Sequence, residues 1–197
     1  MGKIKSALEI ALERTESVKS DKGGIALFEA KQKGKKLANE YLEGAIKSLD
    51  NEIKKEPSGA QESLKQGIFD VLLSRLALPA VKDDLKRIES AGAGLAAVIA
   101  NKRFAEIVKQ FNELMIQYMD ESAQYEEAVQ RQYAPKLRQK EEELSRRMGR
   151  QVKIDPFQDP EFLAFLNQHT NALKGNYQAA VDQVREEALR LFSGDQA

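Results

Sequence analysis

The sequence contains no cysteine and no tryptophan, and it has a single histidine, His169. Without cysteine the chain has no disulfide framework, no thiolate nucleophile and no cysteine-based zinc or iron–sulfur site. Without a second histidine a metal site would need carboxylate ligands, and the chain shows no Glu-x-x-His pair of the di-iron bundle type. The sequence therefore predicts a cytoplasmic protein that holds no cofactor or metal.

The chain also lacks a net charge and a long apolar run. Its Lys and Arg residues number 31 and so do its Asp and Glu residues, so no net field draws it onto nucleic acid or an anionic membrane. The longest weakly apolar run, residues 91–100 (AGAGLAAVIA), has about half the length needed to cross a bilayer. The first residues scatter charges through an amphipathic pattern that is unlike a secretory signal. We expect neither a nucleic-acid partner nor a membrane segment.

A long helical pattern dominates what is present. Over residues 102–149 an inward stripe repeats at spacings of four and three, which is typical of a helix packed lengthwise on another helix. Such a helix would be about 70 Å long. Pro135 predicts a bend in it, and Gly149 a left-handed cap. Three further apolar residues widen one flank of the stripe, so the helix has room for more than one neighbouring helix. The stripe consists of Phe104, Val108, Phe111, Met115, Tyr118, Ser122, Tyr125 and Val129, and the flank consists of Ile107, Leu114 and Ala128.

A second long helix is predicted after the connection at residues 150–159. Asp159 is expected to cap it, Pro160 suits its first turn and Glu161 suits the positive end of its dipole. A connection of about ten residues favours an antiparallel hairpin of residues 102–197. The predicted inward face is Phe162, Leu166, His169, Leu173, Asn176, Ala180, Val184, Ala188 and Leu191. His169 is thus predicted to be a core residue.

Residues 1–101 are predicted to form a helical region that holds the core. Helices are expected over residues 3–19, from Ile25 to Glu56 with Gly34 as a weak point, and over 60–78, with a break at residues 22–24 and Ser58 as a cap. The helix at 60–78 is apolar around much of its circumference, so it should be buried most deeply. The run SAGAGLAAV at 90–98 lacks the third glycine and the preceding strand of a nucleotide-binding loop. It predicts a tight turn between helices. The fold class is therefore all-α, an elongated helical bundle with a long antiparallel coiled-coil-like hairpin.

Two groups of residues are candidates for binding. Tyr118, Tyr125 and Tyr133 recur every seven or eight residues on one face, which suits either the core, the favoured alternative, or a protein interface. A basic tip between the two long helices could grip an acidic partner or a phosphate, or could complement the negative end of the first helix. Its members are Arg146, Arg147, Arg150 and Lys153.

The opening KIKSALEIALERTESVKSDK, residues 3–22, is similar to the openings of small uncharacterised bacterial proteins of unknown function. This resemblance is confined to that stretch. It implies a bacterial origin and carries over no active site.

No constellation of residues predicts catalysis. The adjacent acids at 126–127 and 141–143 have no partner base or nucleophile, so they are expected to be solvated helix faces. The leading hypothesis is a non-enzymatic interaction or scaffold protein that contacts an unknown protein partner along its hairpin. The first long helix has more stripe than the second can cover, so the remainder should meet either the N-terminal helices or a second copy of the chain in a homodimer. The alternative is a ligand-binding bundle with a pocket between the helices of 60–100 and the hairpin, around His169.

Overall fold

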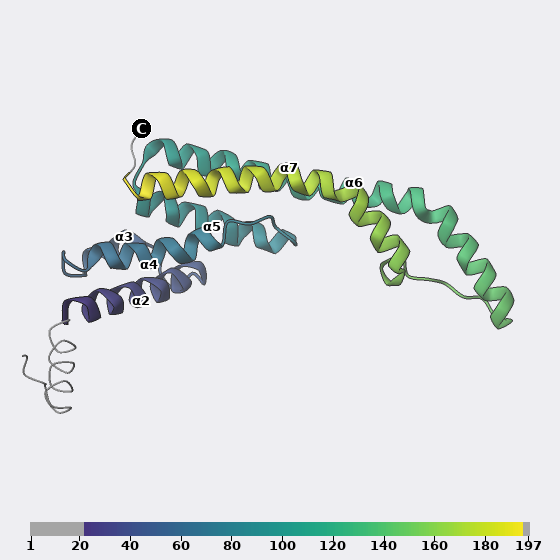
Figure 1. The fold of residues 1–197 in the computed structure, drawn as a ribbon, viewed down its shortest axis with the longest axis horizontal. Helices are drawn as coiled ribbons and strands as arrows, with labels where there is room; N and C mark the ends of the chain where they lie inside the picture. Colours follow the sequence, from purple (N-terminus) through teal and green to yellow (C-terminus); the bar gives the residue numbers. More distant parts are fainter. Residues whose placement is uncertain (1–21, 195–197) are drawn as a thin grey trace, which may run out of the picture. The chain divides into compact units, whose positions relative to one another are not determined.

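The computed structural model describes residues 22–194, and within them every regular element is helical (Figure 1). The all-α fold class is confirmed. The predicted helix at residues 3–19 lies outside the described residues. The elements are α2 (Lys22–Leu42), α3 (Leu49–Lys54), α4 (Gln61–Ser74), α5 (Lys82–Ile99), α6 (Lys102–Met148), the 3-10 turn η1 (Pro156–Gln158) and α7 (Pro160–Phe192).

Packing divides the described chain into two compact units. The first unit comprises residues 22–75 and 90–101, and the second comprises 76–89 and 102–194. One division therefore falls at residue 101, where the predicted hairpin begins. Residues 76–89 group with the hairpin, whereas the sequence pattern placed them with the N-terminal region.

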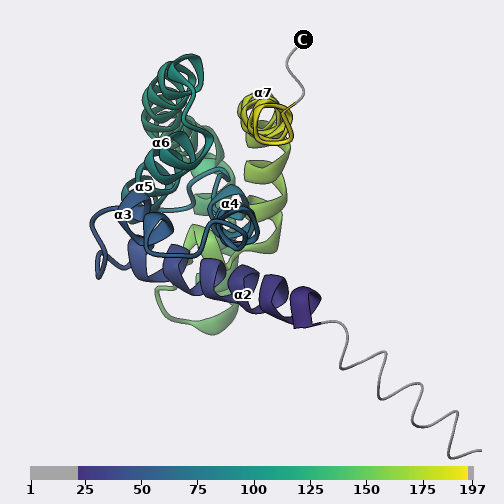
Figure 2. The ribbon, with the colours of Figure 1, turned by 90° about the vertical axis from the view of Figure 1, so that its left-hand side faces the viewer.

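In the first unit, α2 packs mainly against α4, and the two helices lie side by side in both ribbon views (Figures 1 and 2). Most of the large, fully buried side chains of this unit come from α4, and Leu95 comes from α5. Those of α4 are Leu64, Ile68, Phe69 and Leu72. The prediction that this helix is the most deeply buried is confirmed.

Three predicted boundaries in this unit are wrong. The helix expected to run to Glu56 stops at Leu42, because Gly44 adopts a left-handed φ of 79° and Ser48 caps a separate α3 by accepting from the amide of Asn51. The break expected at residues 22–24 is instead the first turn of α2. Ser58 does not cap α4, whose N-cap is Ala60 without a side-chain bond.

The run at residues 90–98 forms part of α5, so the prediction of a tight turn there is also wrong. The chain turns after it, where Ala100 has a φ of 53°. The small residues serve packing, since a Cβ on Gly94 would lie 2.7 Å from Cδ1 of Leu72. Leu95 and Val98 are buried.

In the second unit, α6 is a single helix of 47 residues that continues through Pro135 and changes direction in its C-terminal part (Figure 1). Gly149 follows it with a φ of 64°, as predicted for a left-handed cap. Asp159 caps α7 as predicted, because its Oδ1 accepts a hydrogen bond of 3.0 Å from the amide of Glu161. Helix α7 then runs back along α6. No helix in residues 22–194 combines the length and apolarity that a bilayer span requires.

The inward face of α7 differs from the predicted stripe in its central part. Phe162, Val184 and Ala188 are buried as predicted. His169, however, is exposed and Thr170 is buried in its place, so the core assignment of His169 is wrong. The hydroxyl of Thr170 donates to the Leu166 carbonyl at 3.0 Å, and this bond within the helix lets a polar side chain face inward without an unpaired donor.

Candidate interaction surfaces of the hairpin

The three tyrosines of α6 do not form one exposed face. Tyr118 and Tyr133 are each only 5% exposed, whereas Tyr125 is 48% exposed. The ring of Tyr118 packs against that of Tyr177 with centroids 5.1 Å apart, and Tyr133 packs against Phe162 at 5.3 Å. Two of the three therefore belong to the contact between α6 and α7, and Tyr125 alone offers its ring to a partner.

Near the start of α7, a polar cluster adjoins the core around Tyr133. Lys140 Nζ lies 2.7 Å from Asp159 Oδ2 and 3.1 Å from Glu161 Oε2, and Lys136 Nζ lies 2.8 Å from Glu161. The Tyr133 hydroxyl lies 3.4 Å from both Lys140 Nζ and Asp159 Oδ2. Because Asp159 also caps α7, this cluster fixes the start of α7 against α6.

The pKa directions in this cluster follow from its contacts. The hydrogen bond from Lys140 lowers the pKa of Asp159, and the same bond raises the pKa of Lys140. The hydrogen bond from Lys136 lowers the pKa of Glu161. All these groups keep their charges at neutral pH, which suits a structural ion pair and not a proton donor or acceptor.

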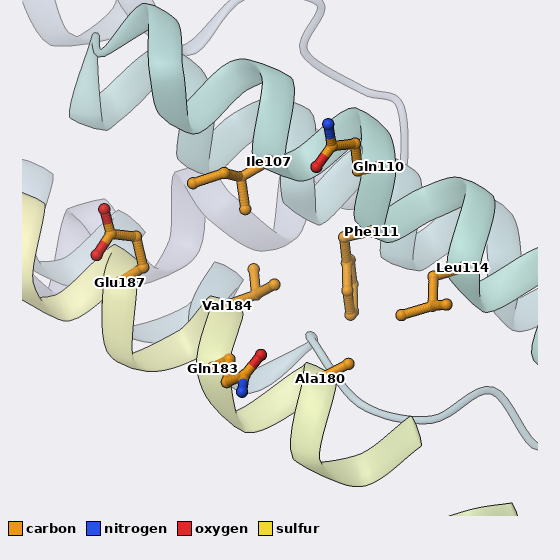
Figure 3. A pocket seen from close by; sticks show the side chains of 8 residues that line it. All are labelled: Ile107, Gln110, Phe111, Leu114, Ala180, Gln183, Val184 and Glu187. Atoms are coloured by element: carbon orange, nitrogen blue, oxygen red, sulfur yellow. The ribbon is translucent and has the colours of Figure 1, made fainter. Parts of the chain in front are cut away.

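A groove opens between α6 and α7 on one flank of the hairpin (Figure 3). Its volume is about 400 Å³, and we call it the flank groove. Figure 3 shows the α6 and α7 side chains facing each other across it. Its lining is Ile107, Gln110, Phe111 and Leu114 from α6, with Ala180, Gln183, Val184 and Glu187 from α7.

The flank groove has an apolar floor and a polar rim. Ile107 and Leu114 are two of the three residues that widen the α6 stripe, so the sequence pattern indicated the α6 side of the groove. The α7 half could be found only from the fold. At the rim, Glu187 Oε1 lies 2.7 Å from Arg190 Nη2, and this bond lowers the pKa of the Glu187 carboxyl group.

The four basic residues of the tip are all exposed. The connection after Gly149 folds back onto the end of α6, because Ser145 Oγ accepts from the Val152 amide and Glu141 Oε1 accepts from the Ile154 amide, each at 2.9 Å. This return creates the tip cleft, of about 400 Å³. It is lined by Arg138, Glu141, Glu142, Ser145, Arg146, Gln151, Val152 and Lys153. Arg146 and Lys153 thus share one cleft, while Arg147 and Arg150 lie outside its lining.

His169 lines neither the flank groove nor the tip cleft. Its exposed ring packs against Phe165, with the two centroids 4.3 Å apart. Among residues 22–194, no three or more histidine and carboxylate side chains gather in a way that could hold a metal ion. The pocket predicted around His169 therefore has no counterpart in either of these two cavities.

Residues 50–190 match the family of unknown function DUF6657, which covers α3 through nearly all of α7. The chain belongs to this family. Searches among curated proteins and among solved structures found no match.

Proposed function

We propose that this protein is a non-enzymatic helical interaction protein, and that its flank groove binds an amphipathic helix of a protein partner. The observation that carries the proposal is the groove itself, whose floor consists of Ile107, Phe111, Leu114, Ala180 and Val184. Burial of such a surface against apolar side chains is the main driving force of protein association.

The form of the groove favours a helix over other occupants. Ile107 and Leu114 are two helical turns apart on α6, and Ala180 and Glu187 are two turns apart on α7. Two antiparallel helices leave a furrow that accepts the side-chain ridge of a third helix. The polar rim of Gln110, Gln183 and Glu187 then suits the polar flanks of an amphipathic helix.

The carboxyl groups support a role without catalysis. Every Asp or Glu with a resolved shift in the described part of the chain has a lowered pKa, and in each case a cation or a backbone amide stabilises the charged form: Asp70, Asp84, Asp159, Glu161 and Glu187. A general acid would need a raised value. The composition without cysteine favours the cytoplasm as its compartment.

Glutamate substitutions in the groove test the proposal. The tagged protein carrying Ile107→Glu or Leu114→Glu should fold but lose the partner that the unchanged protein retains in an extract of its own cell. Ile116→Glu is the matched control, since Ile116 is exposed on the same helix but does not line the groove. Retention of the same partner by the folded groove variants would contradict the proposal.

The nature of the occupant needs a second measurement. Because the chain has no cysteine, Gln183→Cys supplies a single cross-linking position at the groove rim. Cross-links should map to an apolar-striped helix of another protein. Cross-links to a second copy of this chain would instead make the groove a dimer contact, and cross-links to unstructured segments would contradict the helical occupant.

The groove volume also supports a second candidate function. A cavity of about 400 Å³ lies within the range of small-molecule sites, roughly 300–1,000 Å³. The ligand would be a small apolar molecule, bound away from His169. A thermal-shift screen of fatty acids and aromatic compounds tests this, and a shift that Leu114→Glu abolishes would favour it over a helical partner.

A further inference from the structure

Charge is concentrated at the tip of the hairpin. The segment LSRRMGRQVKI at residues 144–154 contains four cationic side chains and no acidic one, although the whole chain has a formal net charge of 0. A local excess of positive charge on a neutral protein attracts an anionic surface over short distances and with a strong dependence on salt.

Acids flank this segment at residues 141–143 and at Asp155. Two of them accept from backbone amides: Glu141 accepts from the Ile154 amide, and Asp155 accepts from the Phe157 amide at 3.0 Å. Glu142 is paired with Arg146 at 3.8 Å, which is close to the limit of an ion pair. Among residues 22–194, no carboxylate comes within 4.0 Å of the cationic nitrogens of Arg147, Arg150 or Lys153.

The helix dipole explains the position of only two of these four cationic residues. Arg146 and Arg147 lie in the last turn of α6, where a cation stabilises the negative end of the helix. Arg150 and Lys153 follow Gly149 and stand outside the helix. The favourable effect of the dipole falls off within the last turn, so it gives no reason for these two residues.

The tip cleft places cationic groups around a hollow. Arg138, Arg146 and Lys153 line it together with the two acids Glu141 and Glu142. Beside it, Met148 is 54% exposed and Leu144 is 37% exposed. A partner at the tip would therefore meet guanidinium and ammonium donors in a concave surface, with apolar contacts at its edge.

We propose that the tip cleft binds an acidic segment of a protein partner, with one carboxylate side chain entering between Arg138, Arg146 and Lys153. The incoming carboxylate replaces Glu142 as the partner of Arg146, whose planar fork matches a carboxylate in a two-bond arrangement. Arg147 and Arg150 contact neighbouring acids of the same segment. The proposal rests on the proposed function, because it names the chemistry that the hairpin recognises at a second surface.

The shape of the cleft distinguishes this partner from an anionic membrane. A membrane would reach the cleft only through a single lipid headgroup, whereas an acidic segment offers one carboxylate to the cleft and further carboxylates to Arg147 and Arg150. Stable binding to a membrane surface also needs a substantial apolar face, and within residues 144–154 the exposed large apolar side chains are Leu144 and Met148.

The test uses the full chain and a fluorescent peptide of alternating glutamate pairs and leucines. Fluorescence anisotropy should show binding at low salt that weakens at least tenfold at moderate salt. The triple variant Arg146→Glu, Arg150→Glu, Lys153→Glu should weaken binding at least tenfold. The matched control is Lys102→Glu, Lys109→Glu, Lys174→Glu, which changes the net charge equally at exposed positions away from the tip and should change affinity less than twofold.

The outcomes separate the tip from the alternatives. Equal weakening in both triple variants would show non-specific attraction and overturn the proposal. Binding to phosphatidylserine vesicles without binding to the peptide would replace it with a membrane contact, and displacement of the peptide by inorganic phosphate at equal affinity would replace it with a phosphate site. Leu114→Glu should leave peptide binding intact, so failure of the flank groove and failure of the tip are distinguishable.

Discussion

Gly34 of α2 and Gly67 of α4 each lie directly against the backbone of the other's helix. A Cβ on Gly34 would come within 2.1 Å of the Leu64 carbonyl oxygen, and one on Gly67 within 2.0 Å of the Lys31 carbonyl oxygen. Atoms cannot approach so closely, so the two helices pack at a separation that only glycine allows at these positions. An ion pair of 2.8 Å between Lys31 and Asp70 joins the same two helices.

Alanine at Gly34 or Gly67 should therefore destabilise the first unit by about 2 kcal/mol or more, since overpacking forces the backbones apart. At an open position within a helix, Gly→Ala usually stabilises the protein by about 1 kcal/mol. Gly175→Ala is the control that should show this gain, because Gly175 lies within α7 with open space around it. Denaturant unfolding measures all three variants, and a stabilising Gly34→Ala would contradict the close crossing.

Asp159 should contribute stability that depends on pH. Lys140 lowers its pKa in the folded state, so the contribution is present above the unfolded value near 4 and is lost as the pH falls through the folded value. Asp159→Asn keeps an oxygen for the cap but removes the charge. The stability difference between the original protein and this variant should be largest at pH 7 and should shrink below pH 4.

Asp159→Ala removes the cap as well, which costs about a further 1 kcal/mol. Thermal unfolding at several pH values provides the comparison. A difference between the original protein and Asp159→Asn that stays constant from pH 7 to pH 2 would show that the carboxylate charge contributes nothing to folding.

Asn112 on α6 carries a buried Oδ1 that has no hydrogen-bond partner among the described residues. An unpaired buried acceptor costs free energy, so Asn112→Leu should raise the free energy of unfolding by about 1 kcal/mol. Asn112→Asp should lower it at neutral pH, because an unpaired charge is costlier than an amide, and the loss should diminish in acid. Urea unfolding at pH 7 and pH 4 measures both; a destabilised Asn112→Leu would mean that the amide is satisfied.

Tyr118 and Tyr125 should respond differently to glutamate. Tyr118→Glu puts a charge against Tyr177 and should cost about 3 kcal/mol or more. Tyr125→Glu should leave folding unchanged within about 0.5 kcal/mol, since this side chain is exposed. Under the homodimer hypothesis, light scattering should show a dimer that Tyr125→Glu converts to a folded monomer and Tyr125→Phe leaves intact; a monomer without any substitution would end that hypothesis.

Local chemistry explains which predictions about the hairpin were right. The stripe of α6 has the period of a helix, Gly149 adopts the left-handed conformation that glycine tolerates, and Asp159 has a side chain of the right length to cap α7. Each of these signals depends on residues within a few positions of one another. Pro135 bends such a helix without ending it when the remaining hydrogen bonds and packing hold.

The two candidate surfaces depend on contacts between segments that a local sequence pattern does not predict. The sequence identified the basic tip, but the cleft exists because the connection folds back through Ser145 and Glu141 and brings Arg138 beside Lys153. The flank groove likewise requires α7 residues opposite Ile107 and Leu114. Neither arrangement follows from spacing along one helix.

The sequence by itself determined the all-helical class, the length of α6 and the caps at Gly149 and Asp159, because helical period and capping depend on near neighbours. Tertiary structure decided why Gly34 and Gly67 must be glycine, and that Thr170 rather than His169 faces inward. These features depend on which residues of distant segments meet, and on whether a polar side chain finds a partner when it is buried. A periodic pattern predicts which residues face inward only to within about one position. The contact with a neighbouring helix then decides which of two adjacent residues is buried.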